Sequence, residues 1–124
     1  MTQKSTILIA DKKQFLVNII NECFHKEFKC ICVTTEEELF EKLPCADATV
    51  VGLDVCLSNL DNRIEMIARI RSGFTGPIVA LTSILYSSTR ISLLQNGADD
   101  VLTKPFNPDE LAVRTKKLIT LYSR

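Results

Sequence analysis

The sequence predicts an α/β fold in which five parallel strands form one doubly wound sheet with helices on both of its faces. Short apolar segments rich in β-branched residues alternate along the chain with segments whose apolar residues recur at helical spacing. The connections between them are short, and this alternation favours a parallel sheet covered on both sides. A chain of 124 residues fits one domain, residues 1–124.

Five segments are predicted to be strands because each is short, apolar and followed by a polar or turn-forming stretch. They are residues 4–10, 29–33, 48–53, 78–81 and 100–102. Buried parallel strands read as continuous apolar runs of this kind.

The helices between the strands are predicted from apolar periodicity and from capping residues. The first, residues 13–28, places Phe15, Ile19 and Cys23 on its inner face, with Leu16, Ile20 and Phe24 beside them. A threonine three residues before a glutamate, within 34–38, starts the second. Helices at 64–71 and 88–95 follow, with Gly97 ending the latter in a left-handed turn. Asn107 and Pro108 open the last helix, whose inner face is Leu111, Thr115, Leu118 and Tyr122.

The composition excludes several classes of function. Fifteen basic and fifteen acidic residues cancel, so the domain lacks the basic field of a DNA-binding surface. No apolar run approaches the roughly 20 residues that span a bilayer. The N-terminus shows no secretory signal, and five cysteines read as reduced thiols, so we expect a cytoplasmic protein that does not enter a membrane.

Four chemically active residues stand where predicted strands end. Asp54 follows the third strand, and Asp11, Thr82 and Lys104 follow the first, fourth and fifth. Because the carboxyl ends of parallel strands meet at one edge of a sheet, these side chains are expected to converge. Two acids, a hydroxyl and an amine suit a site that handles phosphate on an aspartate.

The stretches that carry these residues resemble the receiver domain of two-component response regulators, a flavodoxin-like fold. They are residues 7–11, 54–62, 77–82 and 97–106, and the resemblance covers essentially all 124 residues. It implies that Asp54 takes a phosphoryl group from a histidine kinase, while Thr82 and Lys104 contact the phosphoryl oxygens. It also implies that Asp11, Asp54 and the backbone carbonyl of Cys56 hold Mg²⁺.

The sequence departs from the family pattern at Lys12, at Val101 and, more mildly, at Ser58 and Asn62, which replace the usual proline and glycine of the loop. Lys12 stands where a second acid is usual, so Mg²⁺ binding should be weak. Either Lys12 partly substitutes for the metal, or it turns to solvent and leaves a weak site on Asp11 and Asp54. Val101 stands where members often carry an aromatic switch residue, so any switch must use backbone shifts. The resemblance also implies a cis peptide at Lys104-Pro105.

The last third of the chain resembles the dimerisation face of the OmpR-type, winged-helix subfamily. This face is formed by the fourth helix, the fifth strand and the fifth helix. Its expected charged pairs are Arg90 with Glu110, Asp100 with Arg114, and less clearly Asp99 with Lys117, around an apolar centre of Ile91, Leu94 and Val113. One self-complementary patch suits a two-fold homodimer. The alternative is a set of local surface ion pairs, each worth little.

The sequence therefore predicts a phosphoacceptor domain that controls dimerisation of a transcription regulator, with DNA bound only through an effector domain outside residues 1–124. It would assist its own phosphotransfer and dephosphorylation without being an enzyme in the ordinary sense. Two alternatives remain: a pseudo-receiver that dimerises without phosphate, and a stand-alone signalling protein. A zinc site on Cys23, His25, Cys30 and Cys32 is disfavoured, because the thiols read as core residues.

Overall fold

The computed structural model describes residues 4–53, 60–83 and 86–123, and in them the predicted five-stranded parallel sheet is confirmed. The strands are β1 Thr6–Ala10, β2 Lys29–Val33, β3 Ala48–Gly52, β4 Ile78–Thr82 and β5 Asp100–Thr103. Their order is β2-β1-β3-β4-β5, and every neighbouring pair is parallel. The carboxyl ends of β1, β3, β4 and β5 therefore lie side by side.

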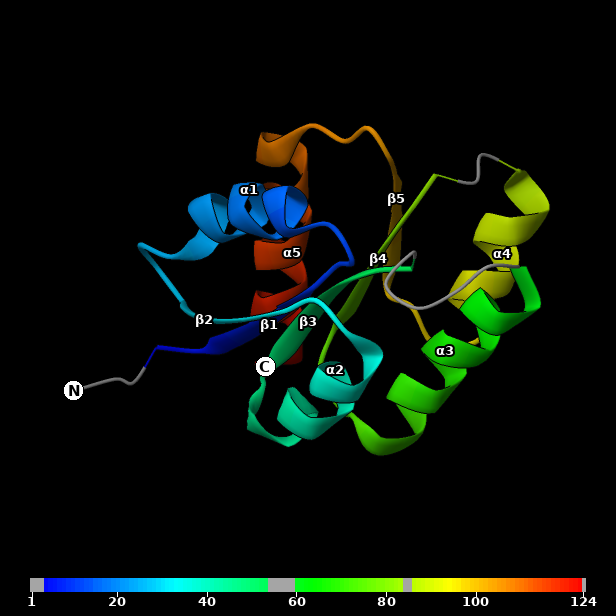
Figure 1. Ribbon diagram of the computed structural model, residues 1–124, viewed down its shortest axis with the longest axis horizontal. Helices are drawn as coiled ribbons and strands as arrows, with labels where there is room; N and C mark the ends of the chain where they lie inside the picture. The colour runs from blue at the N-terminus through cyan, green and yellow to red at the C-terminus, as the bar shows by residue number, and fades with distance from the viewer. Residues whose placement is uncertain (1–3, 54–59, 84–85, 124) are drawn as a thin grey trace.

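Helices cover both faces of the sheet, as predicted (Figure 1). They are α1 Gln14–Phe24, α2 Glu36–Lys42, α3 Leu60–Gly73, α4 Ser87–Gln95 and α5 Pro108–Tyr122, with a 3-10 turn at Leu43–Cys45. Helices α1 and α5 lie on one face, and α2, α3 and α4 lie on the other. In the part of the chain that the structure describes, no helix is both long and apolar enough to cross a membrane.

The core consists of two apolar layers, one on each face of the sheet. Leu8, Val51 and Ala80 pack with α2, α3 and α4, whereas Ile9, Val50 and Val79 pack with α1 and α5. Successive strand residues point to opposite faces, and both faces are covered. This explains why the strands are apolar at every position rather than at alternate ones.

The inner face of α1 differs from the prediction. Phe15 and Ile19 are 58% and 40% exposed, while Val17, Ile20 and Phe24 are buried. The helix also ends at Phe24 rather than near residue 28. The apolar stripe is wider than one helix face, so its period alone could not show which side meets the sheet.

Capping residues place the helix ends largely as the sequence predicts. The Thr35 hydroxyl accepts a hydrogen bond from the Glu38 amide (3.2 Å), and the Asn107 side chain accepts one from the Asp109 amide (2.8 Å). Gly97 follows α4 with φ +129°, which L side chains rarely adopt. Helix α5 thus begins directly after the loop that carries Lys104.

Candidate functional site

The strand ends bring Asp11, Thr82 and Lys104 to one edge of the sheet. Asp11 directly follows β1, Thr82 ends β4, and Lys104 directly follows β5. The Lys104 amide donates to the Thr82 carbonyl (2.8 Å), which joins the last two strand ends. Asp54 and Cys56, the expected phosphoacceptor and carbonyl ligand, lie outside the described residues.

Asp11 and Lys104 form a buried ion pair, so the predicted approach of these two residues is confirmed. The Lys104 ammonium donates to Asp11 Oδ2 at 2.7 Å, and the two side chains are 12% and 0% exposed. Asp11 Oδ1 accepts a hydrogen bond from the Lys13 amide (2.9 Å). A carboxylate this deeply buried needs such partners, because an unpaired buried charge is very costly.

Gly52, which sequence reasoning missed, lies against this carboxylate. A Cβ built on Gly52 would overlap Asp11 Oδ2 and would lie 2.6 Å from Asp11 Cγ. Atoms of real proteins do not approach this closely, so the carboxylate occupies the space of the absent side chain. A lone glycine near the end of a strand was the available signal, since glycine there often marks a close approach.

Thr82 lies at this edge, whereas Val101 lies two residues before the end of β5, beside Ala80 of β4. Thr82 is 1% exposed at the end of β4, and Val101 is buried in β5. The cis peptide expected at Lys104-Pro105 is present. The roles of Thr82, Val101 and Lys104 in phosphate binding and switching stay predictions.

The described residues do not form a ready Mg²⁺ site. Asp11 is the single carboxylate that they contribute at this edge, and both of its oxygens already accept hydrogen bonds. The described residues hold no cluster of three or more histidine, cysteine, aspartate or glutamate side chains that could bind a metal. Mg²⁺ favours several oxygen ligands, so the described residues do not by themselves supply a site for the ion.

Lys12, in the position of the expected second acid, is exposed. It forms no ion pair with any of residues 4–53, 60–83 and 86–123. Of the two interpretations of Lys12, the one in which it turns to solvent agrees with this placement.

The predicted dimerisation face presents exposed apolar side chains beside ion pairs made within the chain. Ile91, Leu94 and Val113 are exposed. Arg114 donates from Nη1 to Asp100 Oδ2 (3.0 Å) and from Nε to Glu110 Oε2 (3.1 Å). The Asp100 hydrogen bond and charge, more than those of Glu110, raise the pKa of Arg114. Asp100–Arg114 is thus a local pair in this chain, and the dimer stays a prediction.

Asp99 has three partners within the chain. Its Oδ2 accepts from Arg71 Nη2 (2.9 Å) and the Ile78 amide (2.8 Å), and its Oδ1 accepts from the Tyr122 hydroxyl (2.6 Å). The expected pairing of Asp99 with Lys117 of a second copy would compete with this network. Sequence reasoning missed Arg71, because its partners lie far along the chain.

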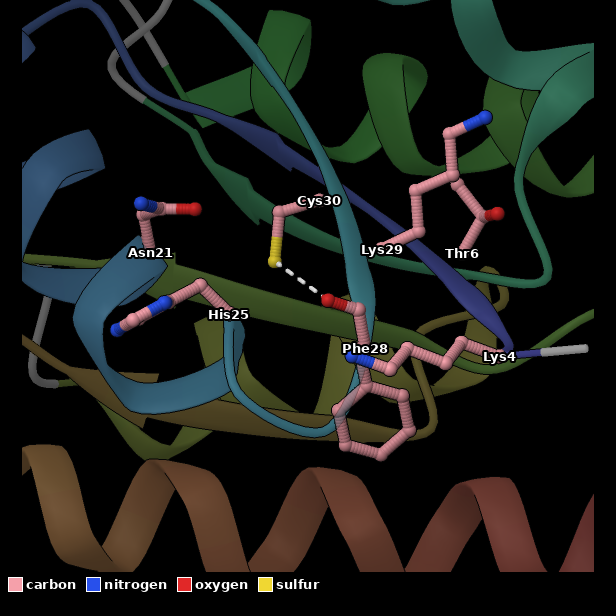
Figure 2. Close-up of a pocket in the computed structure, with 7 residues that line it drawn as sticks. All are labelled: Lys4, Thr6, Asn21, His25, Phe28, Lys29 and Cys30. Carbon is pink, nitrogen blue, oxygen red and sulfur yellow. Dashed lines mark hydrogen bonds between the residues drawn. The ribbon is translucent and has the colours of Figure 1, made fainter.

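A surface hollow of about 700 Å³ lies at the opposite, amino end of β1 and β2. It is lined by Lys4, Thr6, Asn21, His25, Phe28, Lys29 and Cys30. Figure 2 shows the Cys30 thiol turned toward the Phe28 carbonyl, which lies 3.8 Å from the sulfur. Burial, and then the neighbouring Cys32, raises the pKa of Cys30 to about 11. Cys30 and His25 are the two lining residues of a type that binds zinc, fewer than the four ligands of a structural zinc site, so this hollow gives no support to the zinc interpretation.

Cys23 and Cys30 are partly buried against the core, as expected, but Cys32 is exposed. His25 is exposed and lies 3.4 Å from Glu22.

Comparison with known proteins agrees with this geometry. The chain is 30% identical to the transcriptional regulatory protein YvrH of Bacillus subtilis over 116 residues, which is 92% of this chain and 48% of YvrH. It is also 30% identical to the transcriptional regulatory protein PmrA of Pectobacterium parmentieri over 114 residues, 91% of this chain and 51% of PmrA. The chain therefore spans about half the length of these curated relatives.

Solved structures share the fold. A response regulator from Thermotoga maritima superposes with a TM-score of 0.83 at 24% identity, covering 95% of this chain and 99% of that one. The BeF3-activated DrrB receiver domain has a TM-score of 0.82 at 20% identity, covering 95% and 99%. The family described as the response regulator receiver domain matches residues 7–116, and the chain belongs to this family.

Proposed function

We propose that this receiver domain accepts a phosphoryl group on Asp54 from the phosphohistidine of a sensor kinase. The observation that supports this most is the buried ion pair of Asp11 and Lys104, in which Lys104 Nζ lies 2.7 Å from Asp11 Oδ2, next to Thr82 at the end of β4. The Leu53 amide donates to the Leu81 carbonyl (2.8 Å), and Asp54 is the next residue after Leu53. This bond places Leu53, the residue before Asp54, beside the end of β4, the strand that Thr82 ends.

The proposed chemistry is a phosphoryl transfer. An oxygen of Asp54 attacks phosphorus, the phosphorus–nitrogen bond breaks, and the electron pair returns to the imidazole of the kinase. Charge on the transferred oxygens is stabilised by the Lys104 ammonium and the Thr82 hydroxyl, since catalysis of such transfers is mostly positioning and electrostatics. Receiver domains generally bind Mg²⁺ at their acidic site, and here Asp11, Asp54 and the Cys56 carbonyl would hold it weakly.

The test is phosphorylation by a small phosphodonor with Mg²⁺, followed by intact mass. We expect the mass to rise by one phosphoryl group in the wild type and not in Asp54→Ala. Asp47→Asn is the matched control, because Asp47 is an exposed aspartate just before β3, at the far end of the sheet, where its carboxylate accepts from the Thr6 amide. An unmodified wild type, or a modified Asp54→Ala, would contradict the proposal.

We further propose that phosphorylation changes dimerisation of an OmpR-type transcription regulator through α4, β5 and α5, with DNA held by an effector domain. The names of the relatives and the half-length match support this reading. The alternative is a pseudo-receiver that dimerises without phosphate, and the lysine at position 12 favours it. Dimerisation that does not respond to the phosphodonor would select the alternative.

A further inference from the structure

Gly52 and Asp11 face each other across two neighbouring strands. Strand β1 pairs with β3 so that Ile9 lies beside Val50 and Ala10 beside Val51. Continuing this register by one residue brings Asp11 beside Gly52. Their close approach therefore follows from the pairing of the sheet rather than from a flexible loop.

The oxygen that fills the space above Gly52 is the same oxygen that binds Lys104. Asp11 Oδ2 accepts the Lys104 ammonium at 2.7 Å, and this is the atom that a Cβ at position 52 would overlap. Asp11 Cβ would lie 3.2 Å from the added carbon, which is tight but can be relieved by a small shift. A side chain at 52 would thus displace the carboxylate while leaving room for the Asp11 backbone.

We propose that Gly52 is a positioning residue of the acidic site. The missing side chain lets Asp11 turn inward over β3 and pair with Lys104, and this inward position makes the described site a poor fit for a divalent cation. A metal must compete with an ammonium for a fully buried carboxylate, each of whose oxygens already accepts one hydrogen bond. The inference rests on the proposed role of Asp11 as a metal ligand.

Two protons report the position of Asp11 without any phosphorylation. The Lys13 amide donates to Asp11 Oδ1 (2.9 Å), and the Lys104 ammonium donates to Oδ2. The Lys13 amide proton resonance and the exchange rate of the Lys104 ammonium protons can both be measured by NMR in the 124-residue chain. A purely structural defect elsewhere would not move these two signals together.

The test compares Gly52→Ala with wild type and with Gly73→Ala. Gly73 is the matched control, because a Cβ there meets nothing within 4 Å. In Gly52→Ala we expect the Lys13 amide proton to shift upfield and the Lys104 ammonium to exchange faster. We also expect Mg²⁺ to bind about tenfold more tightly, the change that corresponds to removing one competing charged hydrogen bond.

Unchanged NMR signals in Gly52→Ala, or Mg²⁺ affinity equal to or below that of wild type, would overturn the proposal. If Gly52→Ala is too unstable for these measurements, urea denaturation gives the loss in free energy of unfolding that Gly52→Ala causes. This loss is compared between the wild-type background and an Asp11→Ala background. A cost that falls in that background supports the contact, and a cost that is equal in both refutes it. The NMR and urea measurements do not involve Asp54, and none of the measurements uses a phosphodonor, so failure of the phosphorylation test is a separate result.

Discussion

The Tyr122 hydroxyl donates a 2.6 Å hydrogen bond to Asp99 Oδ1 and so joins the last turn of α5 to the start of β5. The other oxygen of Asp99 accepts from Arg71 and from the Ile78 amide. Three elements that are distant in sequence, the ends of α3 and α5 and the start of β4, therefore meet on one carboxylate.

Replacing Tyr122 by phenylalanine should lower stability modestly. Tyr122 is 44% exposed, so we expect a loss of about 0.5–1 kcal/mol in the free energy of unfolding, less than the roughly 1.5–3 kcal/mol of a hydrogen bond to a charged group that is shielded from water. Urea denaturation measures it. Tyr86→Phe is the control, because Tyr86 is 74% exposed, and it should change stability by less than about 0.5 kcal/mol. Equal effects of the two variants would show that the Asp99 contact contributes nothing.

The same contact should make stability depend on alkaline pH. Burial first, and then the hydrogen bond to Asp99, raises the pKa of Tyr122 above its ordinary value of 10.0. A group with a raised pKa in the folded state stabilises the fold below the unfolded pKa, and this contribution is lost as pH rises through the folded pKa. The stability difference between wild type and Tyr122→Phe should therefore be constant below pH 10 and should shrink above it. A difference that grows above pH 10 would contradict this assignment.

Removing the Arg71 guanidinium should be more costly. Besides Asp99, its nitrogens donate to the backbone carbonyls of Gly97, Phe74 and Gly76 at 3.0–3.1 Å. Arg71→Met would leave a partly buried carboxylate and several carbonyls without this donor, so we expect a loss of about 2–4 kcal/mol. Thermal and urea unfolding measure it.

Arg69→Met is the control for Arg71→Met. Arg69 is an exposed arginine that pairs with Glu36 (2.7 Å) and stacks on the Phe40 ring at 4.3 Å. Surface pairs of this kind contribute at most about 1 kcal/mol. If both variants lost the same stability, the hydrogen bonds of the Arg71 guanidinium would not explain the loss in Arg71→Met.

The sequence was sufficient for the order of elements and for the meeting of Asp11 with Lys104, since both follow from apolar runs and from the rule that parallel strands end at one edge. It was insufficient for contacts set by tertiary packing. The face of α1 was mispredicted because Phe15 and Ile19 continue an apolar stripe whose buried part is Val17 and Ile20. Gly52 was missed because a glycine in a strand indicates a close approach without naming the partner, and that partner, Asp11, follows from the register of β1 against β3.

Thiol chemistry should discriminate among the cysteines. With a pKa of about 11, only about one Cys30 thiol in a thousand is ionised at pH 8, whereas Cys45 is exposed. We expect Cys30 to be alkylated much more slowly than Cys45 near neutral pH, with a rate that rises about tenfold per pH unit up to pH 10. Peptide mass spectrometry after timed iodoacetamide treatment measures each site. Rapid labelling of Cys30 at neutral pH would show that its burial is overstated.

A charge placed at the centre of the α4–β5–α5 face should prevent dimerisation. Val113 is 56% exposed on α5, and in the proposed dimer a glutamate there would be buried without a partner, which costs several kcal/mol. Val113→Glu should therefore weaken self-association of the phosphodonor-treated chain at least about tenfold in sedimentation velocity. Phe15→Glu is the matched control, because Phe15 is an equally exposed apolar residue on α1, and it should associate like wild type. Loss of association in Phe15→Glu but not in Val113→Glu would place the interface on α1 instead.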